Sequence, residues 1–369
     1  MNTTRPLAAG LSLLLLSACS TLPPKGRDPG YQNPEGYFGL PAASDLPVET
    51  APGIQAIRPR WRPLSAGGEL SVLAGKIEKP RLEFWALKIE LGAPPESRPS
   101  RTPEGEEKSP NILNIPNIRI VLGAGEGAPP RPGYVSSTRV SSFVLNKGLL
   151  AGINATPFDP SSAREGEERR LAGIAITGGK IAARPVSRFD ALVFYAEGGA
   201  AIVNQGEIDI ETAMAAEAET TAGTRGETML GRAGETEAPP ETAKKRILHA
   251  AGGFHRILQD GELTDRALQK AAAPRHARSA AGLSGGGRTL YLMVIDGGGG
   301  LSGRRGATEA ETALILKQLG ARDVLNLDGG GSSALALRFS DGGVETLNTP
   351  ALFPGRERAV ALCLGIALE

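Results

Sequence analysis

Two aspartates that each end an apolar run have the residue type and the position best suited to acid–base chemistry. Asp296 follows the run from Leu290 to Ile295, and Asp328 follows the shorter run from Val324 to Leu327. Carboxylates can act as bases, acids or nucleophiles at a sugar. Glycines follow both aspartates, so bare backbone N–H groups can approach a ligand closely. Two tight turns without any ligand are the alternative interpretation of the same residues.

The residues around Asp328 add hydrogen-bonding groups of the kind that bind a sugar or a phosphorylated sugar. The segment supplies amide, backbone N–H and hydroxyl donors within eight positions. Its candidate substrate-binding residues are Asn326, Gly329, Gly330, Gly331, Ser332 and Ser333. We expect Asp328, Asp296 and these neighbours to form one ligand site.

The elements that position both aspartates are predicted to be strand, helix and strand. Thr308 and Glu311 have capping-box spacing, and Gly320 supplies a helix stop, so residues 308–319 are predicted to be helical. A helix between two strands is typical of a βαβ unit, whose strands are parallel. If the strands at 289–295 and 324–327 are parallel and close, both aspartates lie on the side of the sheet formed by the carboxyl ends of its strands. We call this side the sheet edge, and it is where α/β sheets collect ligands.

Two arginines are predicted to meet an anion. Arg278 and Arg358 each open a predicted strand of small or apolar residues, where an unpaired guanidinium is costly. The anion is either a ligand phosphate or a protein carboxylate, with Asp296 and Glu357 as the candidates. His276, on the same predicted strand as Arg278, is a candidate acid near neutral pH, unless it is only a surface histidine.

Other motifs and the overall charge exclude several classes of function. Gly298, Gly300 and Gly303 match a dinucleotide fingerprint by letter, but the predicted helix begins too late to receive a pyrophosphate. The three histidines lack metal-ligand spacing, so neither a metal nor a cofactor is expected. The net charge of +1 gives no indication of a nucleic-acid partner. The oligomeric state is not indicated.

The N-terminus predicts export and a lipid anchor. Arg5 precedes an apolar stretch, 7–16, that is too short to span a bilayer. It ends in a Leu-Ser-Ala-Cys sequence that resembles the lipobox of bacterial lipoproteins, with Cys19 as the acylated residue. An ordinary signal peptide is the alternative. Cys363 is the other cysteine and is expected to be buried, so no disulfide is predicted.

The remaining chain predicts one α+β domain over residues 59–369, with a mixed, twisted sheet, a few packed helices and the βαβ unit that carries the site. Residues 1–19 are the signal peptide and 20–58 a tether rich in Pro and Gly. Low-complexity insertions are expected near 92–110 and 210–242, and the second could be a lid over the site. The strand at 149–153 ends at Asn154, which is either a turn former or a site residue.

The chain resembles the phosphodiester glycosidase family. The resemblance rests first on the specific block Asn-Leu-Asp-Gly-Gly-Gly-Ser-Ser at 326–333 and on the helix before it. The Arg-Ser-Ala-Ala-Gly strand from Arg278, the Val-Ile-Asp-Gly ending at 297, Asn154 with Phe158, and Glu357 with Arg358 follow the family's order between about 82 and 367. The family usually has Asn-Gly-Gly-Phe-Phe where this chain has residues 154–158. It commonly has Arg where this chain has Gly298, and Arg304 or Arg305 is the candidate replacement.

The resemblance implies hydrolysis of a sugar-1-phosphodiester in envelope or exopolysaccharide material. Arg278 and Arg358 would hold the phosphate, and Asn154 would contact the substrate. Asp328 would be the nucleophile or base and Asp296 its partner carboxylate. His276 or His255 would be an acid. Two alternatives remain open: a non-catalytic lipoprotein that binds anionic glycans, and a scaffold that engages an envelope partner through the insertion at 210–242.

Overall fold

The computed structural model describes the part of the chain that carries the predicted site. The described residues are 58–63, 70–77, 82–91, 118–127, 131–162, 164–210, 245–297, 306–339, 342–351 and 356–368. The predicted signal peptide with Cys19, the tether and both low-complexity insertions lie outside these ranges, apart from the end residues Arg58 and Ile210. Gly298, Gly300, Gly303, Arg304 and Arg305 also lie outside them.

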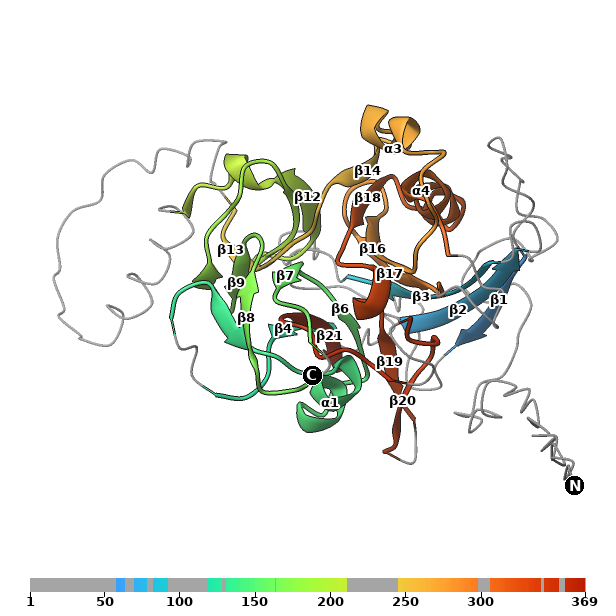
Figure 1. The fold of residues 1–369 in the computed structure, drawn as a ribbon. Helices are drawn as coiled ribbons and strands as arrows, with labels where there is room; N and C mark the ends of the chain where they lie inside the picture. The colour runs from blue at the N-terminus through green and yellow to red at the C-terminus, as the bar shows by residue number, and fades with distance from the viewer. Residues whose placement is uncertain are drawn as a thin grey trace, which may run out of the picture.

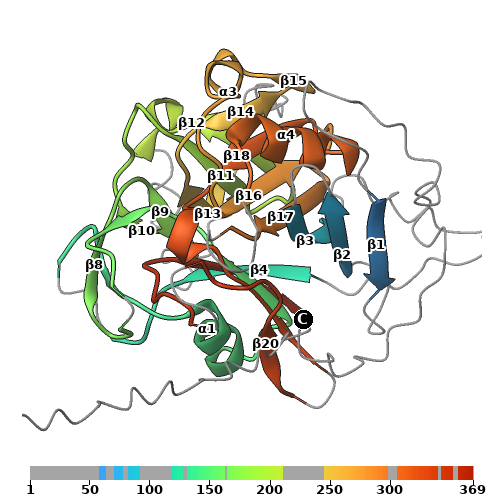
Figure 2. The same cartoon turned by 45° about the vertical axis from the view of Figure 1, so that its right-hand side comes forward.

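The largest sheet has eight strands and carries two helices (Figures 1 and 2). Its order is β1 (Arg58–Pro63), β2 (Leu70–Ile77), β3 (Leu82–Glu90), β17 (Thr289–Ile295), β16 (Arg278–Leu283), β18 (Asp323–Asn326), β14 (Arg256–Gln259) and β15 (Glu262–Leu263). Helix α4 (Glu309–Gln318) covers one face, with the short α3 (Asp265–Gln269) beside it. Strands β1 and β2 extend the sheet beyond β3.

The predicted strand–helix–strand unit is present with one correction. Strand β16 lies between β17 and β18 and pairs antiparallel with both, so β17 and β18 run in the same direction without being neighbours. All strand pairs in the described ranges are antiparallel, so the mixed sheet expected from the sequence is wrong in its pairing. The shared direction still places the carboxyl ends of β17 and β18 on one edge.

Helix α4 begins as the sequence predicts. The hydroxyl of Thr308 accepts the backbone N–H of Glu311 at 3.2 Å, and the Glu311 carboxylate accepts the backbone N–H of Thr308 at 2.9 Å. This reciprocal capping box satisfies two N–H groups that the helix itself leaves without partners. It therefore fixes the start of α4 at the edge of the sheet where Asp296 ends β17.

The second half of the molecule consists of three smaller sheets. One has the order β20 (Val344–Thr346), β19 (Leu335–Arg338), β6 (Ala151–Asn154), β21 (Cys363–Leu368) and β4 (Ile118–Gly123), and α1 (Val140–Asn146) packs against it. Another has the order β10 (Lys180–Ala183), β9 (Ala175–Thr177), β13 (Ile247–Gly252), β11 (Asp190–Tyr195) and β12 (Ala200–Asn204). The third joins β5 (Tyr134–Ser136), β8 (Glu168–Leu171) and β7 (Phe158–Asp159). Figure 1 shows these sheets beside the large one.

The main core lies where the sheets face one another. Leu292 of the large sheet, Ile153 of the sheet with β6 and Leu192 of the sheet with β13 belong to one buried cluster, and each is completely buried. A second cluster, which includes Met293 and Ile315, fills the space between the large sheet and α4. Burial of such side chains stabilises the fold by about 1.5–3 kcal/mol each. The carboxyl ends of β17 and β18 are thus held in place by two buried clusters, one on each face of the large sheet.

Two predicted strand starts are corrected. The hairpins β9–β10, β11–β12 and β16–β17 each connect through a turn that contains glycine. The C-terminal strand begins only at Cys363, so Arg358 precedes β21 and does not open it. His276 likewise precedes β16, in an isolated bridge with Ala307. Within the described ranges, no helix has the length and apolar character needed to cross a membrane.

Candidate active site

The edge formed by the ends of β17 and β18 brings the predicted residues together. Arg278 pairs with Ile295 in the ladder between β16 and β17, and Ala280 pairs with Asn326 in the ladder between β16 and β18. The start of β16 therefore lies between the two strand ends that precede Asp296 and Asp328. Chain segments nearly fifty residues apart meet at this edge because of the antiparallel register.

Asn154 fixes the backbone of Asp328 from the neighbouring sheet. Its side-chain Nδ2 donates to the carbonyl oxygen of Asp328 at 2.6 Å. Its Oδ1 accepts the hydroxyl of Ser279 at 2.7 Å and the backbone N–H of Ala334 at 3.1 Å. The side chain is 0 % exposed. The structure thus places Asn154 behind the Asp328 loop as a positioning residue. The substrate contact expected for it stays a prediction.

The loop after β18 turns back on itself beneath Arg358. Gly330–Ser332 form a 3-10 turn, η3. A Cβ on Gly331 would lie 2.5 Å from Nη2 of Arg358, so glycine is the residue that lets the guanidinium lie against this backbone. Nη1 of Arg358 donates to the hydroxyl oxygen of Ser332 at 3.2 Å. The arginine is therefore held beside the Asp328 loop without a carboxylate within ion-pair distance in the described ranges.

The environment of Asp328 shifts the pKa of its carboxyl group. Burial raises its pKa to about 6, while the hydrogen bond from Ser332, the charge of Arg358 and the backbone N–H of Gly329 oppose that rise. At neutral pH the group is therefore mostly ionised but close to its titration. A carboxylate with these properties suits a nucleophile or a general base.

Asp296 occupies a different environment from Asp328. It is 1 % exposed, and its Oδ1 accepts the backbone N–H of Thr349 at 2.8 Å. Its own N–H donates to the carbonyl oxygen of Glu83 at 2.9 Å. Asp296 thus ties the segment after β20 to the end of β17. The salt bridge to Arg278 considered from the sequence is not found; the ion-pair partner of Arg278 in the described ranges is Glu309.

Arg278 points toward the start of α4. Its Nε donates to the carbonyl oxygen of Ala307 at 3.0 Å, and its Nη1 lies 3.9 Å from Oε1 of Glu309. Burial lowers the pKa of Arg278, and the charges of Glu309 and Glu311 oppose that change. The guanidinium remains a cation, and neither Nη forms a hydrogen bond within the described ranges. Nη1 therefore already faces the Glu309 carboxylate, and Nη2 is the donor left for an additional anion.

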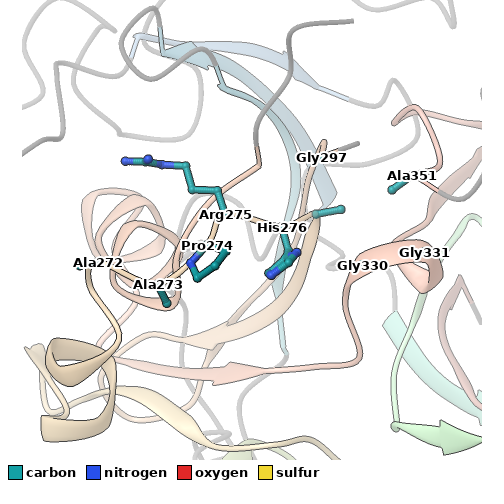
Figure 3. Close-up of a pocket in the computed structure, with 10 residues that line it drawn as sticks. Ala272, Ala273, Pro274, Arg275, His276, Gly297, Gly330, Gly331 and Ala351 are labelled. Carbon is teal, nitrogen blue, oxygen red and sulfur yellow. The ribbon is translucent and has the colours of Figure 1, made fainter. Parts of the chain in front are cut away.

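An open pocket of about 560 Å³ adjoins this edge (Figure 3). Its walls come from the segment before β16, the end of β17, the glycine turn after Asp328 and the segment after β20. The lining residues are Ala272, Ala273, Pro274, Arg275, His276, Ala277, Gly297, Gly330, Gly331 and Ala351. Figure 3 shows the imidazole of His276 within it. Of the predicted catalytic residues, His276 therefore lines the pocket itself. Asp328 and Asp296 adjoin it only through the glycines that follow them, Gly330 and Gly331 after Asp328 and Gly297 after Asp296.

Unpartnered polar atoms gather around the same edge. Six buried side-chain N or O atoms find no hydrogen-bond partner within the described ranges. Five belong to residues at or next to the site elements: Thr156 Oγ1, Glu309 Oε2, Asn326 Oδ1, Ser333 Oγ and Arg358 Nε. Because buried polar groups are normally paired, these atoms are candidates for hydrogen bonds to a bound ligand.

The remaining predicted residues lie at the edge in supporting positions. Asn326 and Ser333 are buried, at 4 % and 0 % exposure. The Ser333 carbonyl accepts the side-chain Nδ2 of Asn348 at 2.9 Å. His255 is half-buried between β13 and β14, and burial, together with the charge of Arg266, lowers its pKa. It is absent from the pocket lining described above.

Two functional candidates were missed by the sequence reasoning. Glu309 contacts Arg278. Arg275 lines the pocket and binds Glu311 through two nitrogens, at 2.6 and 3.0 Å. Glu357 was considered from the sequence as a carboxylate partner for the two arginines. It instead accepts hydrogen bonds from the N–H and hydroxyl of Ser141 in α1 and from the hydroxyl of Thr346. The position of Glu309 directly after the N-cap was the one available signal, because it put a carboxylate at the site edge.

A family model covers the part of the chain that carries this site. The family model described as phosphodiester glycosidase matches residues 147–367. No curated protein matches the chain. The catalytic domain of zebrafish N-acetylglucosamine-1-phosphodiester alpha-N-acetylglucosaminidase, auto-inhibited by its pro-peptide, is similar over 87 % of this chain and 86 % of its own, at 14 % identity and a TM-score of 0.48.

Two bacterial structures are also similar. A hypothetical protein from Synechocystis matches 82 % of this chain at 15 % identity and a TM-score of 0.45, and the match spans 62 % of that protein, under two thirds of its length. A Burkholderia pseudomallei protein described as exported matches 78 % of this chain and 74 % of its own, at 15 % identity and a TM-score of 0.43. The family match covers more than half of the chain and contains the whole edge described above, from Asn154 to Arg358. The chain belongs to the phosphodiester glycosidase family.

Proposed function

We propose that the protein hydrolyses a sugar-1-phosphodiester at the bond between the anomeric carbon and the phosphate oxygen. The observation that carries the proposal is the setting of Asp328. Its backbone is held by Asn154, its carboxyl pKa is about 6, and its glycine turn lies between Arg358 and the open pocket. A poised carboxylate beside a cation that lacks a carboxylate partner in the described ranges suits a substrate that combines a sugar with a phosphate.

The charges that develop in this reaction match the groups at the edge. As the C–O bond breaks, positive charge grows on the sugar ring and negative charge on the departing phosphate. The Asp328 carboxylate stabilises the positive charge on the sugar, as a nucleophile at the anomeric carbon or as the base that takes a proton from water. Arg358 and Arg278 stabilise the negative charge on the phosphate. The bonding electrons leave with the phosphate oxygen, and the water oxygen ends on the sugar.

The remaining residues support these roles. His276 is the pocket-lining group that can deliver a proton to the departing phosphate. Asp296 is the partner carboxylate, and through Thr349 it holds the segment that contributes Ala351 to the pocket. Ser332 and the N–H groups of Gly329 to Gly331 are donors for sugar or phosphate oxygens. No metal or cofactor is required by this scheme.

Phosphorus NMR on a panel of sugar-1-phosphodiesters tests the proposal. The panel includes the methyl phosphodiester of α-N-acetylglucosamine 1-phosphate, because a structurally similar zebrafish enzyme is named for such a bond. We expect phosphomonoester and free sugar to appear. In ¹⁸O-labelled water the label should enter the sugar. Label in the phosphate would instead indicate attack at phosphorus and overturn the proposed bond cleavage.

The Asp328→Asn variant identifies the catalytic carboxylate. It should fold normally and lose at least ~100-fold in turnover, the scale of removing an acid–base group. Asp260→Asn is the matched control, since Asp260 lies in an exposed turn at φ 51° that asparagine also tolerates. Turnover near the wild-type value in Asp328→Asn would remove Asp328 from catalysis. Saturable glycan binding without turnover in both proteins would assign the edge to a binding function.

We propose the cell envelope as the location, with a lipid on Cys19. The support is the Leu-Ser-Ala-Cys sequence and the Pro- and Gly-rich residues that follow it. Labelled palmitate should enter the wild-type protein and be absent from Cys19→Ala, and globomycin should block processing. Processing that is insensitive to globomycin, or a mature N-terminus without lipid mass, would contradict the anchor. This placement makes envelope or exopolysaccharide material the proposed source of substrate.

A further inference from the structure

Glu309 is a buried carboxylate at the site edge that the scheme above does not use. It is the first residue of α4, directly after the N-cap Thr308, and is 6 % exposed. A negative charge at a helix N-terminus is favourable, because the first N–H groups and the helix dipole present positive charge there. This explains why α4 tolerates a carboxylate at that position. It does not explain why the carboxylate is directed at two cations outside the helix.

The two cations come from different elements. Oε1 of Glu309 lies 3.9 Å from Nη1 of Arg278 and 3.6 Å from Nζ of Lys270, at the end of α3. The Ala307 carbonyl, two residues earlier in the chain, accepts Nε of Arg278 at 3.0 Å. The segment that leads into α4 therefore holds Arg278 at two places, once through a backbone oxygen and once through charge.

The second oxygen of this carboxylate is the costly one. Oε2 is buried without a hydrogen-bond partner in the described ranges. Leaving a buried charged group partly unsatisfied is unfavourable, because its interaction with water is lost without replacement. A residue kept at such a cost within a site edge is more consistent with a functional demand than with stability alone.

A neighbouring pair shows what a purely structural arrangement looks like. Two residues further along α4, Glu311 binds Arg275 through Nε and Nη2 at 3.0 and 2.6 Å, and it also closes the capping box. In this bidentate pair both oxygens of the Glu311 carboxylate accept hydrogen bonds from Arg275. The pair of Glu309 with Arg278 is longer and leaves both Nη groups of the arginine without hydrogen bonds in the described ranges. Nη1 of Arg278 thus faces the Glu309 carboxylate, while Nη2 has no partner in the described ranges.

We propose that Glu309 is a positioning residue that orients the Arg278 guanidinium toward the substrate phosphate. The inference rests on the proposed function and extends it by assigning a different positioning element to each of the two arginines. Arg358 is placed by the glycine turn after Asp328, and Arg278 is placed by the first residue of α4. A phosphate bound between them would be approached by Arg358 from the glycine turn and by Arg278 from the start of α4.

Binding of inorganic phosphate tests this without requiring turnover. Isothermal titration calorimetry is carried out on the wild type, Glu309→Gln, Arg278→Gln and the double variant, with circular dichroism and thermal melting to verify folding. We expect Glu309→Gln to weaken phosphate binding by about tenfold or more, because misplacing one group can cost up to a hundredfold. The double variant should bind no more weakly than Arg278→Gln alone. Lys270→Gln, which removes the other cation near Glu309, should bind like the wild type.

Kinetics on the methyl phosphodiester of α-N-acetylglucosamine 1-phosphate provide the second readout. Glu309→Gln should lower kcat/KM by about tenfold or more, and Glu309→Asp, which keeps the charge, should recover most of it. Wild-type phosphate affinity in Glu309→Gln, or independent and additive losses in the double variant, would overturn the proposal. If the wild type binds phosphate as expected but turns over no diester, the proposed hydrolase function fails and the positioning role stands.

Discussion

The side-chain Nδ2 of Asn154 donates to the carbonyl oxygen of Asp328 across 2.6 Å, and so joins the end of β6 to the loop after β18. The same side chain accepts hydrogen bonds from Ser279 in β16 and from the backbone of Ala334 before β19. One amide thus connects two sheets and the loop that carries the proposed catalytic carboxylate. The position of Asp328 is therefore set by the packing of the sheets against each other.

Replacement of Asn154 by alanine should destabilise the protein and misplace Asp328. It leaves the Ser279 hydroxyl, the Ala334 N–H and the Asp328 carbonyl buried without their partner, at a cost of about 1–3 kcal/mol for each unsatisfied group. We expect a lower urea midpoint and a large loss of kcat/KM. Asn204→Ala is the control, since Asn204 makes several hydrogen bonds far from the pocket lining. Equal activity losses in the two variants would contradict a specific role for Asn154.

The pH dependence of activity should report Asp328. Burial raises its pKa to about 6. Because the ionised form is the one that attacks or accepts a proton, kcat/KM should fall as the pH drops below about 6, since kcat/KM reports the free enzyme. A pH–rate profile from 4 to 9 measures this. An acid limb near the ordinary aspartate value, well below 5, would show that Asp328 is not poised in this way.

The same raised pKa should make Asp328 a source of instability at neutral pH. The folded state holds the proton more tightly than the unfolded state does. The favourable contribution of Asp328 protonation to the free energy of unfolding is therefore complete below the pKa of the unfolded state. It is lost as the pH rises through the folded-state pKa of about 6. Asp328→Asn should then be more stable than the wild type at pH 8, with the difference shrinking toward pH 4. Urea unfolding at both pH values measures it, and a less stable variant at pH 8 would contradict the burial effect.

Gly331→Ala should displace Arg358 while leaving the fold intact. The added Cβ would lie 2.5 Å from Nη2 of Arg358, and the end of a flexible side chain can move away. We expect a small change in thermal stability and a clear loss of kcat/KM with weaker phosphate binding. Gly285→Ala is the matched control, because its Cβ would meet the side chain of Arg322 at 3.1 Å, outside the site. Wild-type phosphate affinity in Gly331→Ala would show that this contact does not place the arginine.

The edge that carries the site could be predicted because local rules and strand direction agree there. The capping box at Thr308, the glycine turns and the apolar run from 290 to 295 are local signals, and each formed the expected element. The shared edge of Asp296 and Asp328 followed from strand direction alone. It is present even though β16 lies between the two strands, because two antiparallel pairings restore the same direction.

The partners of individual side chains could not be predicted in the same way. The ion pair of Arg278 with Glu309 depends on where α4 begins relative to β16, which is a tertiary distance. Asn154 is buried because two sheets pack against each other. No sequence periodicity links Asn154 to Asp328, so their hydrogen bond could not be predicted from the sequence. Arg358 was expected to open a strand because Val360 and Leu362 alternate with small residues, but pairing in β21 begins only at Cys363. Alternation alone does not fix where a ladder starts.

His276 should contribute to catalysis less than Asp328 does. Its imidazole faces the pocket in the segment before β16, where it can protonate a departing oxygen. A phosphate leaves readily without full protonation, so the gain from a general acid falls at or below the usual range of about 10²–10⁴. His276→Gln should therefore lower kcat/KM by less than Asp328→Asn does, and the acid limb near pH 6 should remain in its pH–rate profile because that limb belongs to Asp328. Loss of the limb in His276→Gln would reassign it to the histidine and leave Asp328 without its kinetic signature.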